Sequence, residues 1–284
     1  MIMAKQSSAL AELINRLPDP DERGLLSNID KETVDSVVSQ INEGGRKSLR
    51  ALIGMLVEPG QGDDVKPRYA LHCLAVRMCK SDEEKSRRAF DRTLASQLGG
   101  KRPKAVQKYL IQQLQVAGGN DAVAALGIML EDEELYEPAA QAIVAIGDGA
   151  AGQLRKALPG AKGKAKLTII QNLGVVRDTE SVDALKNAVG DDDRDIRLAA
   201  GWALANLGDA GSVDLLLKAA DAEGTYERAT ATKACLLLAE RLLEAGKKEP
   251  AVKIYTHLRD TRSGPDEAYI SDAAEKGLVS TNKR

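Results

Sequence analysis

Apolar residues recur along most of this chain at spacings of three and four, the pattern of an amphipathic α-helix. The clearest stretch runs from Asp191 to Ala220, DDDRDIRLAAGWALANLGDAGSVDLLLKAA. Its opening carboxylates predict a helix cap, because they can accept the free backbone N–H groups of a first turn. Gly208 predicts the end of this helix, since the residue after the last turn often needs positive φ. The first helix then has one apolar face: Ile196, Ala200, Ala203 and Leu207. A second short helix follows, with Val213, Leu216 and Leu217 inward.

The same two-helix unit recurs toward the N-terminus. Three earlier turns, centred on Gly118, Gly147 and Arg177, match the turn at Gly208. Successive centres lie 29, 30 and 31 residues apart. A fixed period in this range predicts a solenoid, in which each helix pair buries its apolar face against its neighbours.

The segment DRDIRLAAGWALANLGD resembles the HEAT-like repeat, in the short form also found in bilin lyases. The resemblance covers about residues 103–245 and implies an all-α fold, a right-handed α–α superhelix of about eight helix pairs. We therefore expect a single solenoid over residues 1–284. Irregular helix pairs are expected in 1–102, regular repeats in 103–245 and capping helices in 246–284. The motif is specific for the fold and says little about function.

Composition and charge limit which partners and which cellular compartment the sequence favours. The formal net charge is −2 and the pI about 5.9, so no general attraction to nucleic acid or to an anionic membrane is implied. The cysteines, Cys73, Cys79 and Cys235, are odd in number and lie in apolar helical contexts, which predicts buried free thiols in a reducing compartment. No run of eighteen apolar residues predicts a membrane span. We expect a cytoplasmic protein, or an extracytoplasmic one if the chain is a processed fragment.

Catalytic and metal-binding motifs are missing from the sequence. Neither His72 nor His257 is followed by Glu, so the His-Glu pairs of HEAT-type iron hydroxylases are absent. No Cys/His group has metal-ligand spacing, and no phosphate-binding or nucleophile motif occurs. The acidic runs at 131–137 and 191–195 fall at predicted helix starts, where capping explains them. We expect neither catalysis nor a cofactor or metal.

Two basic clusters raise the alternative of nucleic-acid binding. HEAT-like DNA glycosylases grip DNA in a basic groove, although they also use aromatic residues, which make up only 3% of this chain. The competing interpretation is solvated helix flanks balanced by acids elsewhere. The first cluster is Lys85, Arg87, Arg88, Arg92, Lys101, Arg102, Lys104 and Lys108, and the second is Arg155, Lys156, Lys162, Lys164 and Lys166.

The repeat register points to a binding surface. Trp202 lies about 100° from the apolar stripe of its helix, so we expect it outside the core. Equivalent positions in neighbouring repeats should form a ladder, which the HEAT resemblance places on the concave surface. Glutamine side chains both donate and accept hydrogen bonds, and an exposed tryptophan is a typical interface anchor. The alternative is that Trp202 packs against the flank of a neighbouring repeat. The ladder is Gln112, Gln141, Gln171, Trp202 and Lys233.

The sequence therefore favours a non-enzymatic scaffold that binds another protein or peptide on a concave helical surface. Two alternatives stay open: a HEAT-like lyase or accessory protein acting on a protein-bound tetrapyrrole, and a nucleic-acid-binding protein. Neither the partner nor the oligomeric state follows from the sequence.

Overall fold

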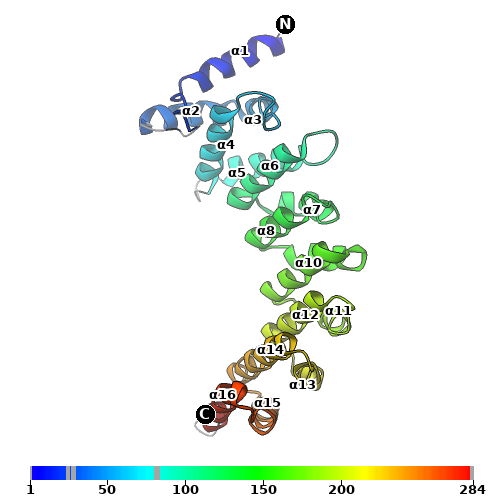
Figure 1. The fold of residues 1–284 in the computed structure, drawn as a ribbon. Coiled ribbons are helices and arrows are strands. Elements are labelled where there is room, and N and C mark those ends of the chain that lie inside the picture. Colours follow the sequence, from blue (N-terminus) through cyan, green and yellow to red (C-terminus); the bar gives the residue numbers. More distant parts are fainter. Residues whose placement is uncertain (1, 24–25, 27–29, 80–83, 282–284) are drawn as a thin grey trace. The chain divides into compact units, whose positions relative to one another are not determined.

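The computed structural model describes residues 2–23, 26, 30–79 and 84–281, with the side chains of residues 2–8 left out. The described residues form α-helices joined by loops and short 3₁₀ turns, with one isolated β-bridge between Pro20 and Leu26 and no strand (Figure 1). The predicted all-α class is confirmed. Contacts divide the chain into two compact units, Met1–Gln153 and Leu154–Arg284. The predicted boundaries at 103 and 246 stay predictions.

Unit 1 is built from two alternating layers of helices. It contains α1 (Ile2–Asn15), α2 (Lys31–Glu43), α3 (Gly45–Gly54), α4 (Val65–Met78), α5 (Glu84–Ala95), α6 (Lys104–Ala117), α7 (Asn120–Met129) and α8 (Tyr136–Ile146), while α9 (Ala150–Ala157) spans the division. Helices α2, α4, α6 and α8 pack side by side in one layer, and α1, α3, α5 and α7 in the other. This alternation is what stacked helix pairs produce, because each pair can bury its apolar stripe only against the next.

Unit 2 has the same layered plan. It contains α10 (Gly163–Val175), α11 (Val182–Ala188), α12 (Arg194–Leu207), α13 (Val213–Ala220), α14 (Thr225–Glu244), α15 (Lys248–Thr261) and α16 (Ala268–Thr281). Helices α10, α12 and α14 lie side by side. Helix α11 packs on α12, α13 packs on α14 and α15, and α16 packs on α15. Leu204 and Leu216 are buried between the layers.

Helix ends in unit 2 follow the sequence signals closely. The carboxylate of Asp193 caps α12 by accepting the backbone N–H of Asp195 at 2.8 Å. Gly208 ends α12 with φ +70°, in the left-handed region that favours glycine. The sequence also predicts one longer helix from Thr225 to Glu244, and α14 has these bounds. The sequence also predicts a helix over residues 82–98 in unit 1 with Ser81 as its cap, and Ser81 lies outside the described residues.

The four repeat turns are not identical. Gly147, Arg177 and Gly208 have positive φ, whereas Gly118 has φ −64° and ψ 165°, an extended conformation open to any residue. A Cβ on Gly118 would lie 2.4 Å from the carbonyl oxygen of Leu114. The close approach to the backbone therefore favours glycine at this position, and three of the four turns have a left-handed residue.

Helix α5 clamps the turn between α6 and α7. The Arg87 guanidinium donates to the carbonyl oxygens of Ala117 at 3.2 Å and Gly118 at 2.7 Å. One turn later, the buried Asp91 carboxylate accepts backbone N–H groups at the start of α7, Gly119 among them. Burial raises the pKa of Asp91 to about 6, although these hydrogen bonds oppose the rise. Arginine thus holds the end of one helix and aspartate the start of the next, as the partial charges at helix termini favour.

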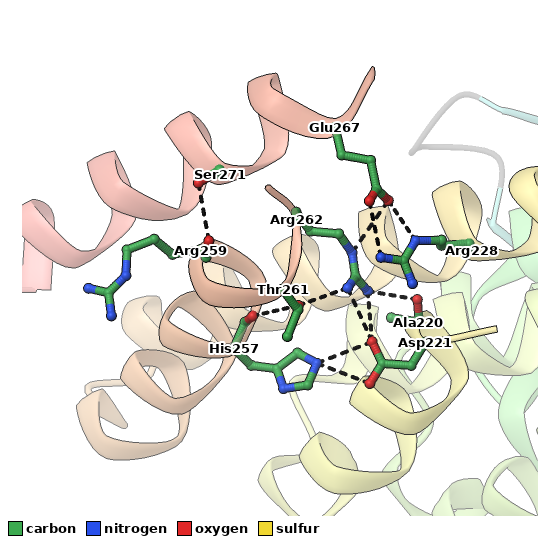
Figure 2. A network of polar contacts seen from close by, with 9 residues as sticks. All are labelled: Ala220, Asp221, Arg228, His257, Arg259, Thr261, Arg262, Glu267 and Ser271. Carbon is green, nitrogen blue, oxygen red and sulfur yellow. Dashed lines mark hydrogen bonds and ion pairs between the residues drawn. The ribbon is translucent and has the colours of Figure 1, made fainter. Parts of the chain in front are cut away.

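A buried arginine joins the last two helices to the rest of unit 2 (Figure 2). Arg262, fully buried after α15, donates to the carbonyl oxygen of Ala220 at 2.7 Å and to the Asp221 carboxylate at 3.1 Å. Glu267, before α16, pairs with Arg228 of α14 at 2.7 Å and approaches Arg262 at 3.6 Å. Two carboxylates therefore compensate the buried charge of Arg262, as such a charge requires.

Candidate partner-binding face

All five ladder residues are exposed, and within each unit they lie on neighbouring helices of one layer. Gln112 and Gln141 lie on the adjacent helices α6 and α8 of unit 1. Gln171, Trp202 and Lys233 lie on α10, α12 and α14 of unit 2. Within each unit the structure thus brings the predicted residues into neighbouring rows. Partner binding by them stays a prediction.

Trp202 is both packed and exposed. Its side chain retains 36% of its accessible surface, which confirms its predicted place outside the core. Its ring also lies against Gly174 of α10, where an added Cβ would be 2.7 Å from Trp202 Cζ3. The same Cβ would be 2.9 Å from Ala203 Cα. Because Gly174 has no side chain, α10 and α12 can approach each other closely and the indole ring can pack against the backbone of α10.

Asn206 ties three helices together beside Trp202. Its Nδ2 donates to the Gly174 carbonyl oxygen at 2.8 Å, near the end of α10. Its Oδ1 accepts from Arg241 Nη2 of α14 at 3.2 Å. These bonds occupy the amide, so Asn206 supports the face. Sequence reasoning missed both Gly174 and Asn206; Asn206, one helical turn after Trp202, shares its face.

Apolar and cationic groups surround the indole. Val175, one turn beyond Gln171, is 51% exposed, and Leu198, one turn before Trp202, is half-buried. Lys233 makes no ion pair within the part of the chain that the structure describes. In unit 1, Val116 is exposed one turn beyond Gln112, which repeats the Gln–Val pairing of α10. The face can therefore supply an aromatic anchor, amide hydrogen bonds and one free cation.

Acids in or shortly before another helix neutralise some of the basic residues. In the first cluster, Arg92 pairs with Asp121 at 2.9 Å and Lys104 pairs with Asp132. In the second, Arg155 pairs with Asp178, and Lys166 with Asp191. The hydrogen bond from Lys166 holds the pKa of the Asp191 carboxyl below its usual range.

These pairs recur with the period of the repeat. Lys186 lies 31 residues after Arg155 and pairs with Asp209, 31 residues after Asp178, at 2.9 Å. Burial raises the pKa of Asp209, but hydrogen bonds from Ser212 and Lys186 outweigh it and leave that pKa lowered. The periodic placement indicates that these cations connect repeats.

The cysteine prediction is only partly right. Cys235 is buried, and burial raises the pKa of its thiol to about 12. Cys73 is half-buried, and Cys79, at the end of α4, is exposed. The Cys79 thiol donates to the Val116 carbonyl oxygen at 3.0 Å, a contact that the sequence does not reveal. The described residues contain no group of three or more potential metal ligands.

Comparisons with known proteins support the repeat assignment. Residues 151–235 match the family model for HEAT repeats. This confirms the resemblance and covers most of the regular part of unit 2. A search of curated proteins finds no significant match.

Three solved structures are similar to this chain. The complex of CpcE and CpcF of phycocyanin lyase from Nostoc sp. PCC7120 is 20% identical, with 80% of this chain and 94% of that chain covered and a TM-score of 0.40. An engineered protein is 19% identical, with 98% and 85% covered and a TM-score of 0.47. Human deoxyhypusine hydroxylase in complex with glycerol is 14% identical, with 98% and 97% covered and a TM-score of 0.35. All three TM-scores are below 0.5, so none of these proteins assigns an activity to this chain.

Proposed function

We propose that this HEAT-repeat chain is a non-enzymatic scaffold that binds another protein or a peptide on the face formed by α10, α12 and α14. The observation that carries the proposal is Trp202, which stays 36% exposed while its ring is fixed against Gly174. Ordering of an aromatic anchor before binding lowers the entropy lost in the complex. Tryptophan is also among the residues that contribute most to interface energy.

The surroundings of Trp202 suit a peptide chain. Val175 offers apolar contact, Gln171 can pair with a backbone amide through both its donor and its acceptor, and Lys233 offers a free charge. Asn206 is committed to Gly174 and Arg241, so it holds the helices and leaves recognition to the exposed residues.

Site-specific crosslinking tests the proposal. A photo-crosslinking residue at Gln171 should capture a partner that the same residue at Lys156, exposed on α9, does not. With that partner purified, Trp202→Ala should weaken binding about tenfold or more, as for an interface hot spot. Tyr269→Ala, which removes an exposed aromatic ring from α16, should leave the affinity unchanged.

A second pair of variants tests the charge. Lys233→Glu should change the affinity, and Lys156→Glu should not. Trp202→Phe keeps a ring against Gly174, so it separates loss of binding from loss of packing. Equal capture from both crosslinking positions, or full affinity in Trp202→Ala, would exclude this face as the binding site.

The two other functions make different predictions. Nucleic-acid binding requires affinity for a DNA duplex that falls steeply with salt. We expect no such affinity, because four of the cluster cations, Arg92, Lys104, Arg155 and Lys166, are ion-paired and the formal net charge of the chain is −2. Lyase or accessory activity on a tetrapyrrole requires a change in bilin absorbance on mixing, and the scaffold proposal predicts none.

The cellular setting of the scaffold is also a proposal. We place it in the cytoplasm on the strength of three free cysteines, one of them exposed. No helix of the described residues is both long and apolar enough to cross a membrane.

A further inference from the structure

A large apolar groove in unit 1 is lined by residues of α1, α2 and α3. Figure 1 shows where these three helices lie in the ribbon. The volume of the groove is about 780 Å³. Leu10 and Leu13 of α1 and Ala51 of α3 line its apolar part. The remaining lining residues are Ala9, Gln40, Gly44, Arg46, Lys47, Ser48 and Arg50.

The rim of this groove carries unneutralised positive charge. Arg46, Lys47 and Arg50 are exposed, and none makes an ion pair among the residues that the structure describes. Helix α3 contains no acidic residue, and Glu43 is the adjacent acid at the end of α2. This differs from Arg92 of α5 and Lys166 of α10, each of which reaches an acid in or shortly before another helix.

The position of two of these cations is unfavourable for the chain alone. Arg46 and Lys47 lie in the first turn of α3, at the positive end of the helix dipole. Acidic residues stabilise a first turn, and cations there oppose the dipole. An external anionic group would compensate both the side chains and the helix terminus, and the apolar lining would compensate burial of apolar groups beside it.

We propose that this groove binds an acidic amphipathic helix from a partner protein. The apolar side of that helix would lie along Leu13 and Ala51, and its carboxylates would pair with Arg46, Lys47 and Arg50. A groove between helices accepts a third helix through residues spaced three and four apart. Charge complementarity selects an acidic helix, because a basic or neutral one would leave three cations facing it unpaired. This site is separate from the face around Trp202.

Fluorescence anisotropy with the full chain tests the proposal. The probe is a labelled helical peptide with Leu at positions three and four apart and Glu on the flanking positions. It should bind, whereas the peptide with Lys in place of Glu, and a scrambled peptide of the same composition, should not. The triple variant Arg46→Glu, Lys47→Glu, Arg50→Glu should weaken binding about tenfold or more, and high salt should act the same way.

Matched controls separate this groove from general charge effects. The triple variant Lys85→Glu, Lys101→Glu, Lys108→Glu reverses three exposed lysines elsewhere in unit 1 and should bind normally. The charge-reversed groove should gain affinity for the Lys peptide, a rescue that a misfolded variant would not show. Trp202→Ala should leave the peptide affinity unchanged, so the two proposals fail independently.

Three outcomes would overturn the proposal. One is equal binding of the Glu and scrambled peptides. Another is equal loss of binding in both triple variants. The third is binding to phosphatidylserine vesicles without binding to the peptide, which would identify an anionic lipid surface as the ligand.

Discussion

A single methyl group added at Gly174 should displace the Trp202 ring from its contact with α10 and destabilise unit 2. In Gly174→Ala the new Cβ would lie 2.7 Å from Trp202 Cζ3 and 2.9 Å from the backbone Cα of Ala203. The indole can turn away, but a helix backbone cannot yield without moving α12 relative to α10. Overpacking of this kind costs about 1–3 kcal/mol, and the better helix propensity of alanine returns about 0.5–1 kcal/mol. We expect a net loss of about 1–2 kcal/mol in the free energy of unfolding.

Gly201→Ala provides the matched control. Gly201 is also a buried helical glycine, on α12, but its added Cβ would lie 3.5 Å from Leu216 Cδ2, an ordinary contact. It borders a cavity of about 150 Å³, so the methyl group enters free space. This variant should gain about 0.5–1 kcal/mol from helix propensity.

Two readouts decide the comparison. Denaturant unfolding followed by circular dichroism gives the stability of each variant. Trp202 is the only tryptophan, so its fluorescence emission reports directly on the packing of its ring against Gly174. Emission should shift to longer wavelength in Gly174→Ala and stay unchanged in Gly201→Ala. Equal stabilisation of both variants, with unchanged emission, would refute the close approach of α10 and α12 and the ordered Trp202 that depends on it.

Three further predictions concern the core, the α5 clamp and the C-terminal network. Leu204→Ala should cost about 2–5 kcal/mol in denaturant unfolding, because it leaves a cavity between the layers; a cost near zero would contradict its complete burial. The pKa of Asp91 is raised in the folded state, so the contribution of this carboxyl group to stability is largest below pH 4 and is lost as pH rises toward 6. Asp91→Asn removes this dependence, so the variant should be more stable than wild type at pH 7 by up to about 3 kcal/mol. Parallel melts should show that the advantage disappears by pH 4, and a difference in stability that stays constant with pH would refute the charged, buried carboxylate. Arg262→Met should lower the free energy of unfolding by about 1–3 kcal/mol, because the Ala220 carbonyl loses its donor and Asp221 and Glu267 lose their shared cation. Hydrogen exchange should become faster in α15 and α16 first. Unchanged exchange there would show that the network does not hold these helices.

The sequence by itself determined the helices of this protein and their order. Spacing of apolar residues, acidic caps and terminal glycines are local signals, so α12 begins at the cap of Asp193 and ends at Gly208 as predicted. The repeat period then fixed which positions are equivalent. For that reason the exposure of Gln171, Trp202 and Lys233 on adjacent helices could be anticipated.

Only the tertiary structure decided what those positions touch. A one-dimensional pattern says that Trp202 leaves the core, but not that Gly174 of another helix receives its ring. Similarly, the sequence does not distinguish the lysines and arginines of a basic run from one another. Folding brings some of them to an acid of the next repeat, as Lys166 pairs with Asp191, and leaves others, such as Arg46, at the rim of a groove. The physical reason is range: caps and propensities act within one turn of chain, whereas close approach and ion pairing depend on distances between residues about thirty positions apart.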